Sequence, residues 1–190
     1  MRSSEAKRIL FITRRYPPSI GGIQTHCYQL YTHLSTTNPV KLVALRQNHL
    51  IHLAWFIPYA FVVSLFQVLF RRVDAIYFSD GVVCCLAPFL RVLSTARFVV
   101  TIYGLELTYS HPIFSLLMKR GIARCDSVVV ISQETQRIAV DSGVPAEKVL
   151  ISYVGIEPPS LAPDRLETVK AAFEEEHGIR FGEDRILLNL

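Results

Sequence analysis

The sequence has few charged residues and few cysteines. Charged side chains make up 19% of its 190 residues and apolar ones 51%. This excludes a disordered or acidic-tail protein, because so much apolar side chain can fill a core. The four cysteines include no Cys-x-x-Cys pair, and the adjacent Cys84 and Cys85 cannot readily cross-link distant segments. We therefore expect reduced thiols in a cytoplasmic protein.

Several signatures of ligand binding and catalysis are also missing. The chain contains no G-x-G-x-x-G, no G-x-x-x-x-G-K-[ST] and no G-x-S-x-G sequence, so an ordinary dinucleotide site, a P-loop and a hydrolase elbow are not expected. Its six histidines show no convergent metal-ligand spacing. The first apolar run is too short for a signal peptide. The net charge of +4 includes scattered basic pairs, which suit anionic lipid head groups or phosphorylated ligands better than nucleic acid.

Short apolar runs alternate with stretches of helical periodicity over residues 1–158. Continuous apolar runs are typical of strands buried on both faces. Strands are expected at residues 8–13, 40–45, 74–79, 97–103, 127–132 and 149–154, and helices near 22–34, 82–93, 110–124 and 133–142. Because strands and helices alternate, right-handed crossovers and a mostly parallel sheet are expected. We predict a doubly wound, Rossmann-like α/β domain over residues 1–158.

Residues 159–190 differ from this pattern. Pro158, Pro159 and Pro163 indicate a linker, and a charged helix is expected over residues 164–177. Residues 185–190 form an apolar run typical of a buried strand, but a lone terminal strand has no sheet of its own to pair with. We therefore expect a linker, a helix and the first strand of an incomplete second domain.

Residues 50–70 form a long apolar segment without Asp, Glu, Lys or Arg, long enough to span a bilayer. A single crossing would separate strands 40–45 and 74–79, which belong to one sheet, and Pro58 interrupts the helix. Leaving half of the large side chains in water would forgo on the order of 10 kcal/mol. We favour a helix that packs on the sheet and meets a membrane interface or partner surface. A re-entrant or paired insertion and a single span are the alternatives.

Polar residues and glycines follow several of the expected strands. Ligands of open α/β sheets bind at the carboxyl ends of the strands. The candidate binding residues there are Arg15, Gly21, Gly22, Asp80, Gly104, Glu106 and Ser132. The segment from Pro17 to Gly22 joins a strand to a helix whose free N–H groups would stabilise a phosphate. A tight turn that needs glycine explains the same segment equally well.

Several of these segments together resemble the amino-terminal half of family 4 glycosyltransferases. They are residues 8–13 with Tyr16-Pro17-Pro18 and Gly21-Gly22-Ile23-Gln24, then Asp74-Ala75-Ile76-Tyr77, then residues 100–104, and finally 126–132 leading to Gly155-Ile156-Glu157. The resemblance implies the GT-B fold, in which two Rossmann-like domains face a cleft. It implies that the first domain binds the acceptor and the second the nucleotide-sugar donor. It further implies a retaining, hexosyltransferase-type transfer without metal or other cofactor, in polysaccharide or glycolipid biosynthesis.

The sequence departs from the family pattern at three places. The family often has a histidine that contacts the donor sugar where this chain has Tyr103, which makes Tyr103 the candidate catalytic residue. Gln24 replaces a glutamate, and the family's Asn-Gly-x-Asp turn reads Val-Gly-Ile-Glu over residues 154–157. The family's donor-binding half is not part of residues 1–190, and catalysis needs charge stabilisation at the departing diphosphate.

These features lead to two functional hypotheses. The first is the acceptor-side domain of a transferase that acts on a lipid-linked or saccharide acceptor and is inactive without a donor domain in cis or in trans. The second is a non-catalytic, membrane-associated binding or scaffold module on the same fold. In both, the protein would be cytoplasmic, with residues 50–70 against the cytoplasmic face of a membrane.

Overall fold

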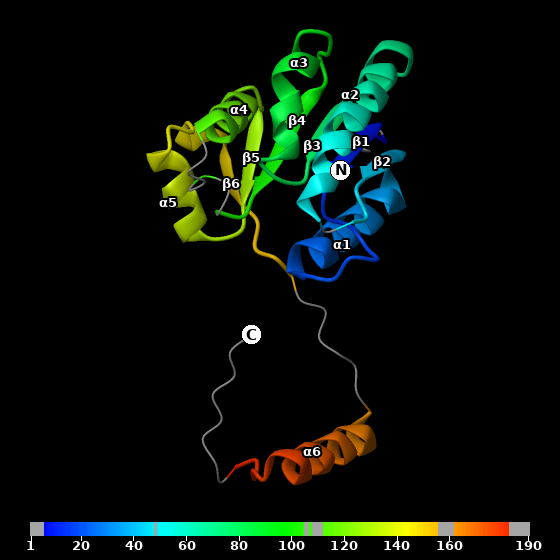
Figure 1. Ribbon diagram of the computed structural model, residues 1–190, viewed down its shortest axis with the longest axis vertical. Helices are drawn as coiled ribbons and strands as arrows, with labels where there is room; N and C mark the ends of the chain where they lie inside the picture. Colours follow the sequence, from blue (N-terminus) through cyan, green and yellow to red (C-terminus); the bar gives the residue numbers. More distant parts are fainter. Residues whose placement is uncertain (1–5, 48, 105–106, 108–111, 156–161, 183–190) are drawn as a thin grey trace, which may run out of the picture. The chain divides into compact units, whose positions relative to one another are not determined.

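The computed structural model describes residues 6–182 except 48, 105–106, 108–111 and 156–161. The chain forms two compact units, Met1–Val154 and Gly155–Leu190. The first unit contains a six-stranded sheet with the order β2-β1-β3-β4-β5-β6, and every neighbouring pair is parallel (Figure 1). The strands are β1 (Ile9–Thr13), β2 (Val40–Ala44), β3 (Ala75–Phe78), β4 (Arg97–Ile102), β5 (Ser127–Val130) and β6 (Val149–Ile151). The predicted doubly wound, parallel fold is confirmed.

The direction of winding reverses between β1 and β3. β1 pairs with β2 on one side and β3 on the other, and Ile9 is in register with both Val40 and Ala75. The chain therefore runs from β1 outward to β2, returns across β1 to β3, and then continues outward to β6. The border between β1 and β3 is thus the topological switch point, where α/β sheets of this kind bind their ligands.

Helices cover the two faces of the sheet unequally. Alternate strand residues point to opposite faces, so Phe11 packs with Cys27 of α1 (Gly22–Thr37), whereas Leu10 and Ile12 belong to a larger core on the other face. That larger core also contains residues of α2 (Leu53–Phe70), α3 (Ala87–Arg91), α4 (Pro112–Ala123) and α5 (Gln133–Asp141). In Figure 1, α3 lies between α2 and α4, and it contacts both.

The helix expected near residues 82–93 forms in two pieces. A 3₁₀ turn, η2 (Val83–Leu86), precedes the short α3. Proline has no N–H, so Pro88 cannot donate the α-helical bond to the carbonyl of Cys84. The N–H of Ala87 bonds to that carbonyl instead, in the tighter 3₁₀ pattern. Two further 3₁₀ turns are η1 (Leu50–His52) and η3 (Ala146–Lys148).

The long apolar segment forms η1 and α2, and α2 packs on the sheet. Phe56, Ala60 and Ser64 are fully buried, and α2 contacts β1. By length and composition α2 could cross a membrane, but β2 and β3 on either side of it both pair with β1. This packing is inconsistent with a single span and agrees with a helix that lies on the sheet.

The second unit contains α6 (Pro163–His177), close to the helix expected over residues 164–177. The helix ends at Gly178, whose φ of 64° is the left-handed conformation that glycine favours, and the Gly178 N–H bonds to the carbonyl of Glu174. The strand expected at residues 185–190 lies outside the described residues, so it stays a prediction.

Candidate functional site

The carboxyl ends of β1, β3 and β4 lie side by side in the sheet. Ile12 is in register with Phe78, and Phe78 with Val100. Arg14 and Arg15 follow β1, Ser79 and Asp80 follow β3, and Tyr103 and Gly104 follow β4. We call this place the switch-point edge. It brings together Arg15, Asp80, Tyr103 and Gly104 of the residues that the sequence singled out.

Helix α1 begins at the switch-point edge, after Gly21. The φ of Gly21 is 153°, a conformation that residues with a side chain rarely adopt, so the turn itself favours glycine. Gly22 has no such constraint, since a Cβ there would meet none of the described atoms within 4 Å. No side chain of the described residues caps the start of α1, which leaves N–H groups and the positive end of the helix dipole for an anion. Turn geometry therefore accounts for Gly21 but not for Gly22.

Asp80 is fully buried, and its interactions are internal. Its Oδ2 lies 3.0 Å from Nε of Arg14, whose side chain is also largely buried. Its Oδ1 accepts hydrogen bonds from the N–H groups of Val82 and Val83, at 2.8 and 3.2 Å, at the start of η2. Asp80 thus joins the end of β1 to the loop after β3. This places it in the framework of the edge.

Arg15 is held at the edge through its backbone. Its N–H donates to Oγ1 of Thr13 at 3.1 Å, and the same hydroxyl lies 3.0 Å from the Arg15 carbonyl. The Arg15 side chain is partly buried, and its Nε has no hydrogen-bond partner in the described part of the chain. A guanidinium in this position can bind a phosphate or a sugar hydroxyl.

Tyr103 pairs with a residue that the sequence did not suggest. The Tyr103 hydroxyl lies 2.8 Å from Nδ1 of His26, in the second turn of α1, and the two rings meet edge to face. Burial raises the pKa of Tyr103 well above its ordinary value and lowers the pKa of His26. Near neutral pH a protonated phenol can therefore donate to Nδ1 of a neutral imidazole. That arrangement leaves the ring proton on Nε2, as a second hydrogen-bond donor at the edge.

The lowered pKa of His26 makes stability depend on pH. The unfolded chain takes up a proton near the ordinary histidine pKa of about 6.5, whereas the folded chain takes it up only at lower pH. Stability is therefore expected to fall as the pH drops below about 6.5. His26→Gln should make this fall shallower in urea unfolding at a series of pH values. His33→Gln, on the exposed side of α1, is the control, and equal slopes for wild type and His26→Gln would contradict the assignment.

The other predicted residues have separate positions. Gly104 has a φ of 109°, which favours glycine, and a Cβ there would approach the side chain of Thr135 at 3.7 Å. Ser132 is the N-cap of α5, and its hydroxyl accepts the N–H of Thr135 at 3.1 Å. Ser132 therefore stabilises a helix start near Gly104. Glu106 lies outside the described residues.

The described residues contain no group of three or more His, Cys, Asp and Glu that could hold a metal ion. What the edge does contain is a set of hydrogen-bond donors. These are the N–H groups at the start of α1, the Arg15 guanidinium and the His26–Tyr103 pair. Such a set suits a ligand with phosphate and hydroxyl groups.

A comparison with known families covers most of the chain. The model of Glycosyltransferase Family 4 matches residues 20–158, which include the start of α1 and the ends of β3, β4 and β5. The chain belongs to Glycosyltransferase Family 4. The family predicted from the sequence is thus confirmed. No curated protein matches the chain significantly.

Solved structures share the fold of this family 4 chain at low sequence identity. HepE from Anabaena in complex with UDP has a TM-score of 0.60 and 16% identity, over 87% of this chain and 50% of HepE. The lipopolysaccharide outer core galactosyltransferase WaaB has a TM-score of 0.55 and 15% identity, over 81% and 47%. UDP-N-acetylglucosamine 2-epimerase from Rickettsia bellii has a TM-score of 0.57 and 12% identity, over 90% and 48%. The chain spans about half the length of each structure, with the fold of one half of a GT-B architecture.

Proposed function

We propose that this chain is the acceptor-side domain of a retaining, hexosyltransferase-type glycosyltransferase that uses a nucleotide-sugar donor. The observation that carries the proposal is the set of hydrogen-bond donors at the switch-point edge, in a chain of Glycosyltransferase Family 4. Three structures of the neighbour HepE hold UDP, UDP with glucose, and UDP-glucose, which supports a nucleotide sugar as the ligand class. The acceptor would be lipid-linked or a saccharide, and the transfer would need no metal or other cofactor.

The residues of the edge suggest separate roles in such a transfer. The uncapped N–H groups of α1 and the Arg15 guanidinium would bind the negative oxygens of the diphosphate. Tyr103 stays protonated because burial raises its pKa, so it would hold the His26 ring and would not act as a base. His26 would then donate from Nε2 to a hydroxyl or phosphate oxygen. A donor domain, in cis or in trans, would supply the remaining charge stabilisation at the leaving diphosphate.

Gly22→Val tests the role of the Gly21-Gly22 turn at the start of α1. Because nothing lies within 4 Å of a Cβ at Gly22, we expect the variant to keep its fold while UDP-glucose binding weakens about ten-fold, equal to about 1.4 kcal/mol. Calorimetric titration and the melting temperature would measure the two effects. His33→Val places the same side chain on an exposed position of α1 as a control. If Gly22→Val unfolds the domain, turn geometry is the better account, and unchanged binding would contradict the proposed ligand site.

A second candidate function is a non-catalytic, membrane-associated binding or scaffold module on the cytoplasmic side of a membrane. It is favoured by the exposed apolar side chains along α2 and by Tyr103 at the position where the family often has histidine. Ligand titration with and without liposomes, combined with an assay for sugar transfer and donor hydrolysis, distinguishes the two functions. Lipid-dependent sedimentation without nucleotide-sugar binding would favour the module.

A further inference from the structure

Helix α2 is apolar around its whole circumference, although the sheet covers only one side of it. Phe56, Ala60 and Ser64 face the core. The outer face consists of exposed residues at helical spacing, namely Trp55, Tyr59, Val62, Phe66, Leu69 and Phe70. A helix that is hydrophobic all round is ordinarily buried on every side. The outer face therefore calls for a surrounding other than water.

The same apolar surface continues onto α3. Phe61 of α2 meets the ring of Phe89 at 6.1 Å between centroids, and Phe89, Val92 and Leu93 are exposed. The outer face thus extends over two neighbouring helices. Contiguous apolar surface of this kind marks a site of interaction with protein or membrane.

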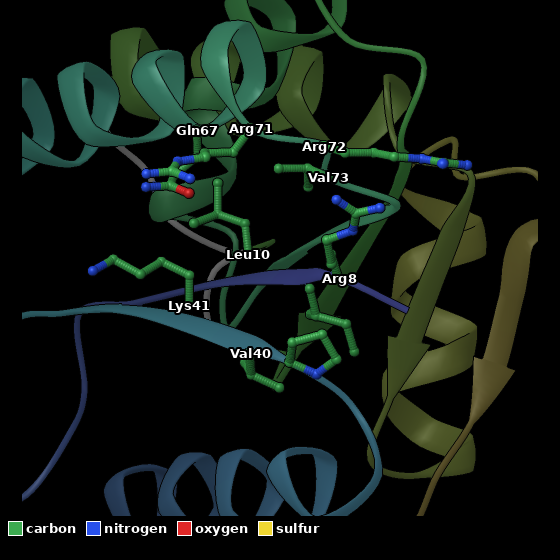
Figure 2. A pocket seen from close by; sticks show the side chains of 10 residues that line it. Arg8, Leu10, Val40, Lys41, Gln67, Arg71, Arg72 and Val73 are labelled. Carbon is green, nitrogen blue, oxygen red and sulfur yellow. The ribbon is translucent and has the colours of Figure 1, made fainter. Parts of the chain in front are cut away.

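A basic pocket lies where α2 ends. It is a cavity of about 400 Å³ at the amino ends of β1 and β2, opposite the switch-point edge. Its lining residues are Arg8, Ile9, Leu10, Pro39, Val40, Lys41, Gln67, Arg71, Arg72 and Val73. Figure 2 shows Gln67 and Arg71 on the α2 side, Lys41 on the β2 side and Leu10 between them. The pocket has cationic walls and an apolar floor.

The positive charge of the pocket is only partly compensated. Arg8 and Arg72 share the carboxylate of Asp74, at 3.9 and 3.6 Å. Lys41 and Arg71 have no acidic partner within the described residues.

Exposed apolar helices, with uncompensated cations where α2 ends, match the interfacial layer of an anionic bilayer. Aromatic and aliphatic side chains enter the boundary between head groups and acyl chains, and nearby Lys and Arg attract lipid phosphates. The described residues that line the pocket include no aromatic side chain on which a base could stack, which argues against a nucleotide. We propose that the outer face of α2 and α3 docks on an anionic phospholipid surface, with a lipid phosphate held in the basic pocket between Arg71 and Lys41. This docking does not depend on the proposed sugar transfer.

The chain contains its own probe of this contact. Its one tryptophan, Trp55, lies on the outer face, so its emission should shift to the blue when the protein binds vesicles. We expect co-sedimentation with vesicles of phosphatidylcholine containing about one third phosphatidylglycerol, and at least about ten-fold weaker binding to phosphatidylcholine alone. Salt should weaken the binding, because screening acts on exposed charges.

Two substitutions test the two parts of the surface. Val62→Asp places a charge on the outer face at a side chain that is 62% exposed, so the fold is kept and vesicle binding should be lost. Arg71→Gln should lower the affinity for anionic vesicles about five-fold, since one cation near the surface contributes about 1 kcal/mol. Tyr153→Asp, in the segment after β6, and Arg137→Gln, on α5, are the controls at exposed positions away from this surface, and both should bind as wild type does.

Other occupants give different results. If inorganic phosphate saturates the pocket and the protein does not bind vesicles, the proposed docking on a bilayer is wrong, and the pocket is a site for a free anion. Equal binding to neutral and anionic vesicles would overturn the role of the pocket. A concentration-dependent dimer that Val62→Asp disrupts, with no vesicle binding by the monomer, would show that a second copy of the chain covers the outer face.

Discussion

Replacing Asp80 with asparagine is expected to lower the free energy of unfolding by about 3 kcal/mol or more. The substitution keeps a side-chain oxygen for the N–H groups of Val82 and Val83. It removes the charge that faces Arg14 at 3.0 Å, where Asp80 is fully buried and the Arg14 side chain is 13% exposed. A buried charge left without its partner loses solvation that nothing replaces, which is why breaking such pairs destabilises strongly. Urea unfolding followed by circular dichroism would measure the change.

The control for Asp80 is an ion pair on the surface. Glu134 and Arg137 lie 2.9 Å apart on α5, with both side chains largely exposed, so Glu134→Gln should have a far smaller effect. If Asp80→Asn were as stable as wild type and lost UDP-glucose binding, Asp80 would be a ligand-binding residue, as the sequence suggested. If Asp80→Asn loses stability and Glu134→Gln does not, Asp80 belongs to the structural framework of the edge.

Gly121→Ala should also be strongly destabilising, although it lies within a helix. On helix propensity alone, alanine would be better than glycine in α4 by about 1 kcal/mol. A Cβ at Gly121, however, would lie 2.1 Å from the carbonyl oxygen of Cys84 and 2.7 Å from its carbon. Cys84 is fully buried, so its backbone cannot move aside without disturbing the core. Overpacking of this kind costs about 3 kcal/mol, and we expect the melting temperature to fall by about 6–10 °C.

Gly22→Ala is the matched comparison for Gly121→Ala. It also adds a methyl group to a helical glycine, but nothing lies within 4 Å of the added atom. Calorimetric melting of both variants separates the clash from the general effect of alanine. An unchanged or higher melting temperature for Gly121→Ala would mean that α4 and η2 can separate at little cost.

Much of the fold could be predicted because a strand buried on both faces has a simple signature. All six expected strands of the first unit form within a few residues of their expected positions, since runs such as residues 9–13 can be covered only inside a parallel sheet. The segment expected to be helical near residues 82–93 is helical, but it divides into η2 and α3 because Pro88 cannot donate a hydrogen bond. The sequence did not predict this division, since a proline near the start of a helix is ordinarily tolerated. The order of the strands could not be obtained from local pattern at all, because it depends on contacts between distant segments.

The position of the site could be predicted from the sequence, but the roles of its residues could be predicted only in part. Asp80 and Ser132 do follow strands, yet their oxygens accept backbone N–H groups of the next turn. The sequence does not distinguish a polar group that faces a ligand from one that caps a helix. His26 was missed because it lies inside α1 and its partner Tyr103 is 77 residues away. Its position one turn after Gly22 was the signal that could have identified it.

The direction of α2 links the two ends of the molecule. The chain leaves β2 at the carboxyl edge of the sheet and returns along α2 to the amino edge, where β3 begins. The 18 residues of α2 extend over about 27 Å at 1.5 Å per residue. Trp55 is near the first edge and Phe70 near the second. If this helix rested flat on a bilayer, the sheet would lie parallel to the membrane, and the switch-point edge would stand at a constant height above the head groups, separated from them by the thickness of α2. An acceptor anchored by its acyl chains would then reach the protein by lateral diffusion in two dimensions, without leaving the leaflet.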